Sequence, residues 1–282
     1  MLPEMEIYHD ISFKTSKLIT KSYSTSFSLA VGLLSPETRQ AIYSIYGFVR
    51  VADEIVDTFH GYNQKILLKN FENDCLEAIA SGISMNPVLH SFAITVKKYN
   101  IPIHFIDSFL LSMKTDLSKH VYENTSELNT YIYGSADVVG LMCIKAFVNG
   151  DEKLYNELEK PAMKLGSAFQ KVNFLRDLKA DVEQLDRKYF PDFDIHSFDE
   201  KTKNALVKNI EEDFREAHEG VKRLPGRSKL AVLVAFDFYL ELLRKIRNTP
   251  ANEIVKTRIR ISDPMKIWLL GKAWMKYKLK LI

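Results

Sequence analysis

The stretch FVRVADEIVDTFH, residues 48–60, carries two carboxylates four positions apart, Asp53 and Asp57. Apolar residues at helical spacing lead into it (AIYSIYGFVRVA, residues 41–52), so we expect a helix. Residues four apart on a helix lie on the same face. The two aspartates therefore form a two-pronged oxygen ligand of the kind that Mg²⁺ accepts.

A second stretch, FQKVNFLRDLKADVEQLDRKYFP at residues 169–191, repeats this spacing with Asp177 and Asp181. Asn173 stands four positions before Asp177, so the three side chains form a row of oxygen ligands two helical turns long. We therefore predict that Asn173, Asp177 and Asp181 hold metal together with the first pair.

An arginine accompanies each carboxylate pair: Arg50 lies three positions before Asp53, and Arg176 lies directly before Asp177. Carboxylates bind a metal that bridges to phosphate, and a guanidinium binds phosphate oxygens in a bidentate way. One Asp-x-x-x-Asp alone is usually a solvated helix face. Two such pairs in otherwise apolar helices would cost several kcal/mol unless they are paired or bind metal. The combination predicts a site for metal-bound diphosphate.

The rest of the chain favours one all-α domain over residues 1–282. The 282 residues include only 11 Gly and 9 Pro, and no Pro-, Gly- or Ser-rich linker divides them. A chain of this length buries a large core and can enclose a cavity. We expect a helix to start at Pro36, a kink between Gly134 and Gly140, and an interruption at Pro161.

Three blocks in this order resemble one family, the squalene/phytoene synthases, and most closely bacterial phytoene synthases. They are YSTSFSLAVGLLSPETRQAIYSIYGFVRVADEIVD (residues 23–57), YIYGSADVVGLM (131–142) and AFQKVNFLRDLKADVEQLDRKYFP (168–191). The resemblance covers nearly the whole chain. It implies an isoprenoid-synthase helical bundle around a central apolar cavity. Glu54 and Asp137 depart from the family pattern, which usually has Asp and Gly there.

The resemblance also implies roles for residues outside the acidic pairs. Ser24 and Ser26, which by spacing alone resemble a helix cap, become diphosphate-binding residues, and Arg187 and Tyr189 become diphosphate contacts. Tyr46 and Tyr131 become catalytic residues whose ring faces stabilise a carbocation. The catalytic set is completed by the four metal-binding aspartates.

The implied activity is the Mg²⁺-dependent head-to-head condensation of two prenyl diphosphates, with Mn²⁺ as an alternative metal. We expect two geranylgeranyl diphosphates to give phytoene through prephytoene diphosphate, as in carotenoid biosynthesis. One alternative is squalene or dehydrosqualene formation from farnesyl diphosphate, with NADPH needed only for squalene. Two others are a class I terpene cyclase and a non-enzymatic assembly factor derived from the family.

Composition bears on other classes of function. The two cysteines and seven histidines show no metal-ligand spacing, and the acidic N-terminus differs from a secretory signal, so we expect a cytoplasmic protein.

From Lys256 to the end stand eight Lys or Arg and one acid, Asp263, interleaved with Trp268 and Trp274. This segment suits peripheral contact with an anionic membrane. A net charge of only +3 argues against nucleic acid as a partner.

Overall fold

The computed structural model describes the backbone of residues 3–185, 187–191 and 198–281, and their side chains except those of residues 3 and 181–185. Within these residues the regular elements are helices. One isolated β-bridge pairs Val121 with Lys188. The elements are α1 (Pro3–Tyr23), α2 (Thr25–Val31), α3 (Pro36–Asp57), α4 (Gln64–Ser81), α5 (Pro87–Lys98), α6 (Ile103–Asp116), α7 (Thr125–Ile132), the π-helix η1 (Tyr133–Asp137), α8 (Val138–Val148), α9 (Glu152–Leu185), α10 (Glu200–Arg223), α11 (Gly226–Asn248), α12 (Ala251–Ile254) and α13 (Asp263–Lys278). The all-α fold class is confirmed.

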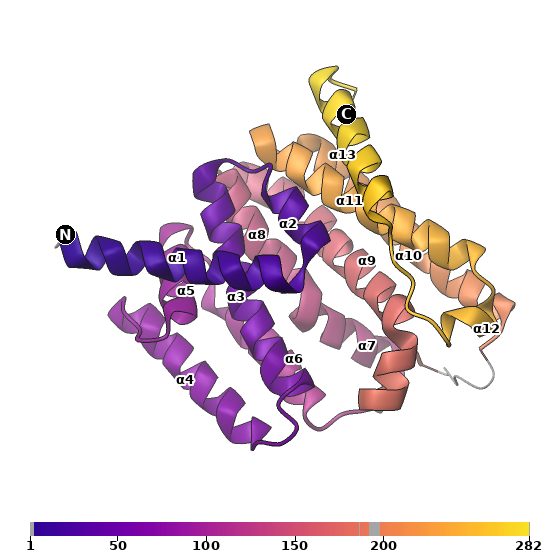
Figure 1. Ribbon diagram of the computed structural model, residues 1–282, viewed down its shortest axis with the longest axis horizontal. Coiled ribbons are helices and arrows are strands. Elements are labelled where there is room, and N and C mark those ends of the chain that lie inside the picture. Colours follow the sequence, from indigo (N-terminus) through magenta and orange to yellow (C-terminus); the bar gives the residue numbers. More distant parts are fainter. Residues whose placement is uncertain (1–2, 186, 192–197, 282) are drawn as a thin grey trace.

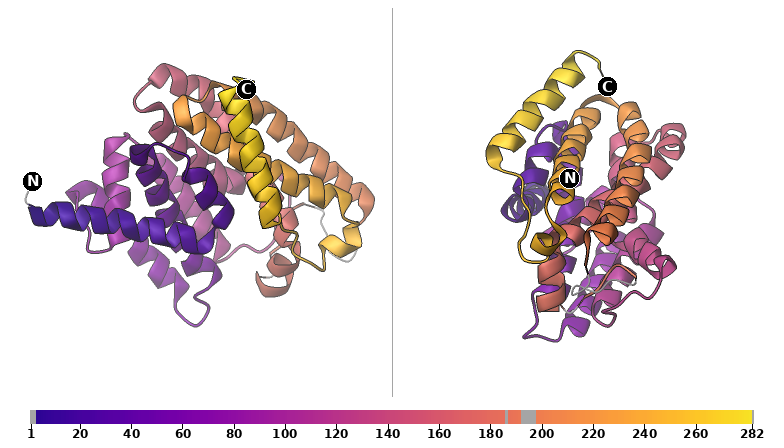
Figure 2. Two further views of the ribbon diagram at one scale, coloured as in Figure 1. Left: turned by 45° about the horizontal axis from the view of Figure 1, so that its top comes forward. Right: turned by 90° about the vertical axis from the view of Figure 1, so that its right-hand side faces the viewer.

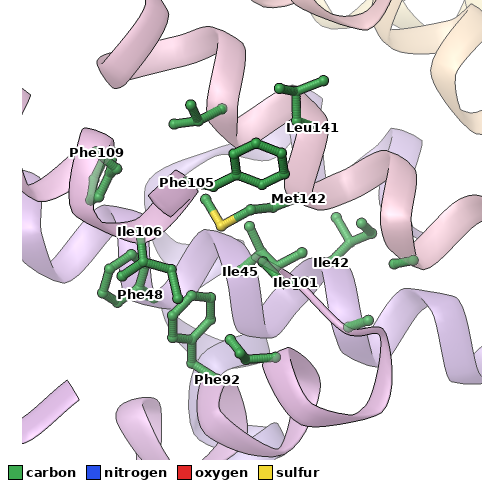
Figure 3. Close-up of a cluster of buried hydrophobic side chains, with 14 of the residues drawn as sticks. Ile42, Ile45, Phe48, Phe92, Ile101, Phe105, Ile106, Phe109, Leu141 and Met142 are labelled. Atoms are coloured by element: carbon green, nitrogen blue, oxygen red, sulfur yellow. The ribbon is translucent and has the colours of Figure 1, made fainter. Parts of the chain in front are cut away.

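The N-terminal part of the bundle is built around α3. Its buried side chains meet those of α5, α6 and α8 in one apolar cluster, shown in Figure 3. Phe48 of α3 stacks on Phe92 of α5 with ring centroids 4.1 Å apart and leans on Phe109 of α6 at 5.3 Å. Aromatic pairs at such distances add to the burial energy of their rings. This cluster fixes the orientation of the helix that carries Asp53 and Asp57.

A second apolar cluster joins α9 to α10 and α11, with α13 lying along α11 (Figures 1 and 2). The prediction that Pro161 interrupts its helix is wrong, because α9 runs unbroken through it. A proline costs one helical hydrogen bond, but the α10 packing compensates here. A Cβ on Gly220 would lie only 2.3 Å from the Pro161 ring, so this glycine lets the two helices approach closely.

The predicted irregularity between Gly134 and Gly140 is the π-helical turn η1, followed directly by α8. A Cβ on Gly134 would lie 2.1 Å from Ser112 Oγ and 2.4 Å from the Ser108 carbonyl oxygen, so η1 sits hard against α6. π-turns often occur where a helix serves a functional site. Here the wider turn places Ser135 and Ala136 in the wall of a cavity.

By length and mean hydropathy (1.4), the helical run Thr125–Val148 could cross a membrane. However, 61% of its most apolar window is buried inside the protein, as in a core helix, so the run is weak evidence for a membrane span.

Candidate active site

A cavity of about 660 Å³ lies between the two halves of the bundle. Its wall is formed by side chains of α2, α3, η1, α8, α9, α10 and α11, and most of them are apolar, among them Val31, Ile45, Phe147, Leu165 and Phe238. The cavity reaches the surface beside exposed lining residues such as Ser22 and Arg258. The predicted central apolar cavity is therefore present.

Five of the predicted site residues line this cavity: Ser24, Ser26, Tyr46, Asn173 and Arg176. Ser24 is the N-cap of α2 and accepts a hydrogen bond from the Phe27 backbone N–H at 3.2 Å. Tyr46 stacks on the Phe27 ring at 4.8 Å, and burial raises its pKa to about 12. Tyr46 is therefore part of the cavity wall, with its ring packed on that of Phe27.

The first carboxylate pair stands beside the cavity wall, near the end of α3. Burial, reinforced by the negative charge of Asp57, raises the pKa of Asp53 to about 8, although Arg50 opposes the shift. Asp57 accepts a hydrogen bond from Arg187 Nη1 at 2.8 Å. Arg50 forms an ion pair with Glu54 and lies over the Tyr23 ring, 4.3 Å from its centroid.

The second motif lies on α9, where Asp177 is bound by two arginines. Arg176 Nε donates to Asp177 Oδ1 at 3.0 Å, and Arg258 Nε forms an ion pair with the same oxygen at 2.8 Å. Both arginines line the cavity. Asn173, one turn earlier, accepts a hydrogen bond from the Tyr239 hydroxyl at 3.2 Å. Asp181 belongs to the same helix, but its side chain lies outside the described residues.

The donor set fits Mg²⁺ shared with a phosphate. Among the described side chains, no three of His, Cys, Asp and Glu are grouped as a self-sufficient metal site. Mg²⁺ is commonly held by one or two carboxylates together with substrate phosphate oxygens. Burial, with the charge of Asp57 adding to it, raises the pKa of Asp53 and so disfavours its ionised form, which a bound cation would favour. Asp53 and Asp57 would hold metal on one side, and Asn173 and Asp177 on the other.

Seven predicted residues with described side chains are not part of the cavity wall: Arg50, Asp53, Asp57, Tyr131, Asp177, Arg187 and Tyr189. Tyr131 belongs to a buried aromatic cluster with Tyr122 and Tyr189, and its hydroxyl donates to Asp116 Oδ2 at 3.0 Å. Tyr189 accepts from Arg187 Nη1 at 3.4 Å. Tyr131 is thus not among the residues that line the cavity, and its ring face packs against other aromatic rings.

Several lining residues were missed from the sequence: Gln170, Tyr239, Arg258, Arg260 and Lys266. Arg258 and Arg260 belong to the run KTRIR, residues 256–260, which the charge pattern assigned only to a membrane-facing segment. Lys266 Nζ lies 3.3 Å from Thr25 Oγ1, so the first turn of α13 lies next to α2, and the segment before α13 contributes residues 258–261 to the cavity wall. In the sequence, the alternation of basic and apolar residues in this run was the feature that could have indicated cavity-lining arginines.

The squalene/phytoene synthase family model matches residues 20–264. The chain belongs to this family. Its members are prenyltransferases. Phytoene synthase 1 (chloroplastic) of Solanum lycopersicum is 29% identical over 276 residues, covering 92% of this chain and 66% of that protein. Phytoene synthase of Arthrospira platensis is 28% identical over 260 residues, covering 83% of this chain and 84% of that protein.

Solved structures share the fold. A dehydrosqualene synthase in complex with ligand superposes with a TM-score of 0.84 at 23% identity, over 97% of this chain and 98% of that one. Squalene synthase HpnC from Alicyclobacillus acidocaldarius superposes with a TM-score of 0.74 at 21% identity, over 86% of this chain and 95% of that one. The chain therefore has the all-α isoprenoid-synthase fold, and it spans about two thirds of the length of the plant relatives.

Proposed function

We propose that this protein joins two prenyl diphosphates head to head, and that the product is phytoene formed from two geranylgeranyl diphosphates. The observation that carries the proposal is an apolar cavity lined by Arg176, Arg258 and Lys266, with Asp177 paired to Arg258 and Asp53 close to the lining residue Tyr46. An isoprenoid chain needs the apolar wall, and its diphosphate needs the cations. The names of the sequence relatives support the C20 substrate.

In the first half of the reaction, one substrate loses diphosphate and becomes an allylic cation. Bound Mg²⁺ supplies electrostatic stabilisation of the leaving diphosphate. Arg176 and Arg258 donate hydrogen bonds to its oxygens, and Ser24 and Ser26, which also line the cavity, bind diphosphate. The double bond of the second substrate attacks the cation, a proton is lost, and prephytoene diphosphate results.

In the second half, the remaining diphosphate leaves, the cyclopropyl skeleton rearranges, and loss of a second proton gives the linear C40 product. The Tyr46 ring, held by Phe27, faces the cavity and stabilises positive charge without bonding to it. The apolar side chains exclude water, which would trap the cations. A hydride from NADPH in place of the proton loss would give squalene from two C15 substrates.

Incubation of the purified protein with Mg²⁺ and either geranylgeranyl or farnesyl diphosphate, with and without NADPH, tests the proposal. We expect phytoene and diphosphate from the C20 substrate without NADPH. Squalene or dehydrosqualene from the C15 substrate alone would reassign the substrate. A cyclic product from one diphosphate would make the protein a terpene cyclase, and no turnover of either substrate would favour a non-enzymatic role.

We further propose that the protein is cytoplasmic and that it contacts an anionic membrane through α13. Lys272, Lys276 and Lys280 follow one another at four-residue spacing, but the first two are half-buried and near Asp237 of α11. Burial raises the pKa of Asp237, and the charges of these two lysines oppose the rise. The outward face instead carries exposed apolar side chains with Lys278 and Lys280 beside them: Ile267, Trp268, Trp274, Met275, Leu279 and Leu281.

A further inference from the structure

Arg187 lies between two carboxylates that are far apart in the sequence. Its Nη1 donates to Asp57 at 2.8 Å, and its Nε lies 3.9 Å from Asp116 Oδ1. Its Nη2 also donates to the Asp116 backbone carbonyl at 3.3 Å. The side chains of Arg187 and Asp116 are only 5% and 3% exposed, whereas that of Asp57 is 35% exposed. Asp116 is therefore the buried partner of this arginine, and Asp57 is the partner facing the site.

The contact between the two side chains is an ion pair without a hydrogen bond. Neither Arg187 Nε nor Asp116 Oδ1 has a hydrogen-bond partner among the described residues. A buried guanidinium is costly unless a negative charge lies close to it. Burial lowers the pKa of Arg187, but the charges of Asp116 and Asp57 more than offset this and hold it above its ordinary value. Removing the charge of Asp116 would leave Asp57 as the nearest carboxylate that neutralises Arg187.

Asp116 is itself fixed in position. It is the last residue of α6, and its second oxygen accepts the Tyr131 hydroxyl at 3.0 Å. The contacts thus run in a chain from Tyr131 through Asp116 and Arg187 to Asp57. These contacts link Tyr131 to Asp57, although Tyr131 is not among the residues that line the cavity.

We propose that Asp116 is a positioning residue, which neutralises Arg187 from the buried side so that Asp57 keeps enough negative charge to bind a divalent cation. The inference rests on the proposed metal-binding role of Asp57. Without the Asp116 charge, Arg187 competes with the cation for Asp57.

Binding of Mn²⁺ to the protein with inorganic diphosphate present, followed by the EPR signal of free Mn²⁺, tests this without turnover. We expect Asp116→Asn to weaken Mn²⁺ binding about tenfold, because one nearby negative charge is lost. Tyr131→Phe should weaken it in the same direction by a smaller factor. Tyr122→Phe is the matched control, because its buried hydroxyl has no partner among the described residues, and it should leave Mn²⁺ binding unchanged.

A second comparison serves if Asp116→Asn does not fold. Removing both members of a buried ion pair costs less than removing one, so Asp116→Asn combined with Arg187→Gln should fold. Arg187→Gln alone should bind Mn²⁺ more tightly than the unaltered protein, and adding Asp116→Asn to it should change the affinity by much less than about tenfold, because no arginine is left for Asp116 to neutralise. A loss of about tenfold in affinity from Arg187→Gln to the double variant would overturn the inference, as would an unchanged dissociation constant in folded Asp116→Asn. Failure of the unaltered protein to bind Mn²⁺ would instead overturn the metal proposal and this inference with it.

Discussion

At the residue scale, the carboxylates of the first motif repel each other. The ionised form of Asp53 is disfavoured, since burial and the charge of Asp57 raise its pKa to about 8. We expect Asp53→Asn to lower turnover at least about a hundredfold, the size of effect seen when one charge-stabilising group is removed. The melting temperature of the metal-free protein should stay the same or rise, because a repulsion is lost.

Calorimetry and product assays on the same preparation check this. Asp10→Asn is the control, because Asp10 is an exposed acid paired with Lys14 on α1 and should leave turnover unaffected. A fall of several degrees in melting temperature for Asp53→Asn would mean that this carboxylate is a structural ion-pair partner.

Asp137, the departure from the family pattern in η1, predicts a pH effect on stability. Burial raises its pKa to about 7, although Ser167 donates a hydrogen bond to it at 2.8 Å. The charge of Asp213 adds to the rise, and Lys171 and Lys164 oppose it. Because this pKa exceeds the unfolded value of about 3.9, the fold binds the proton more tightly than the unfolded chain does. The resulting stabilisation is present at low pH and is lost as pH rises through about 7.

We therefore expect Asp137→Asn to gain about 1–3 kcal/mol relative to the unaltered protein between about pH 4 and pH 8. Urea unfolding at both pH values measures the difference. A variant-minus-parent difference that does not change with pH would show that Asp137 titrates as it does in the unfolded chain.

At the scale of elements, close helix contacts through glycines shape the cavity wall. Gly134 is the tightest of them, with Ser112 Oγ at 2.1 Å and the Ser108 carbonyl at 2.4 Å from the position of a Cβ. We expect Gly134→Ala to destabilise the fold by about 2 kcal/mol, since η1 must move away from α6. Gly271 on α13 has open space around its Cβ position, so Gly271→Ala should stabilise the fold by up to about 1 kcal/mol.

Chemical denaturation of both variants compares an identical substitution in two environments. Equal effects would mean that intrinsic helix propensity, and not the η1–α6 contact, governs both positions.

At the scale of the whole molecule, α13 lies on the outside of the bundle and leads back to the cavity mouth through Lys266 and the segment of residues 255–262 (Figure 1). The proposed C40 product is insoluble in water, so a bilayer at the mouth would receive it. We expect salt-sensitive binding to phosphatidylglycerol vesicles, with each lysine near the surface contributing about 1 kcal/mol. Trp268→Ser with Trp274→Ser should weaken this binding.

Sedimentation with vesicles at low and high salt measures the effect. Leu18→Ser, which removes an equally exposed apolar side chain from α1, should leave the binding unchanged. Protein that remains in the supernatant with these vesicles at low salt would refute the contact.

The sequence alone determined the all-α class, the start of α3 at Pro36 and the helical spacing of each carboxylate pair. These are local properties. Spacing of three or four residues places side chains on one helical face whatever the helix packs against, so Asp53 and Asp57, and Asn173 and Asp177, could be grouped before any fold was known. The motif blocks identified the family for the same reason, because each is contiguous in the chain.

Only the tertiary structure decided which charges meet across the bundle. Asp57 pairs with Arg187, which is 130 residues away, and Asp177 with Arg258, which is 81 residues away. It also placed Tyr131 outside the cavity and carried α9 through Pro161. Such contacts depend on how far one helix is shifted and rotated against another, and this is set by the side chains of the whole interface. No local spacing contains that information, so the buried Asp116 acquired its partner only when α6, α7 and the segment after α9 came together.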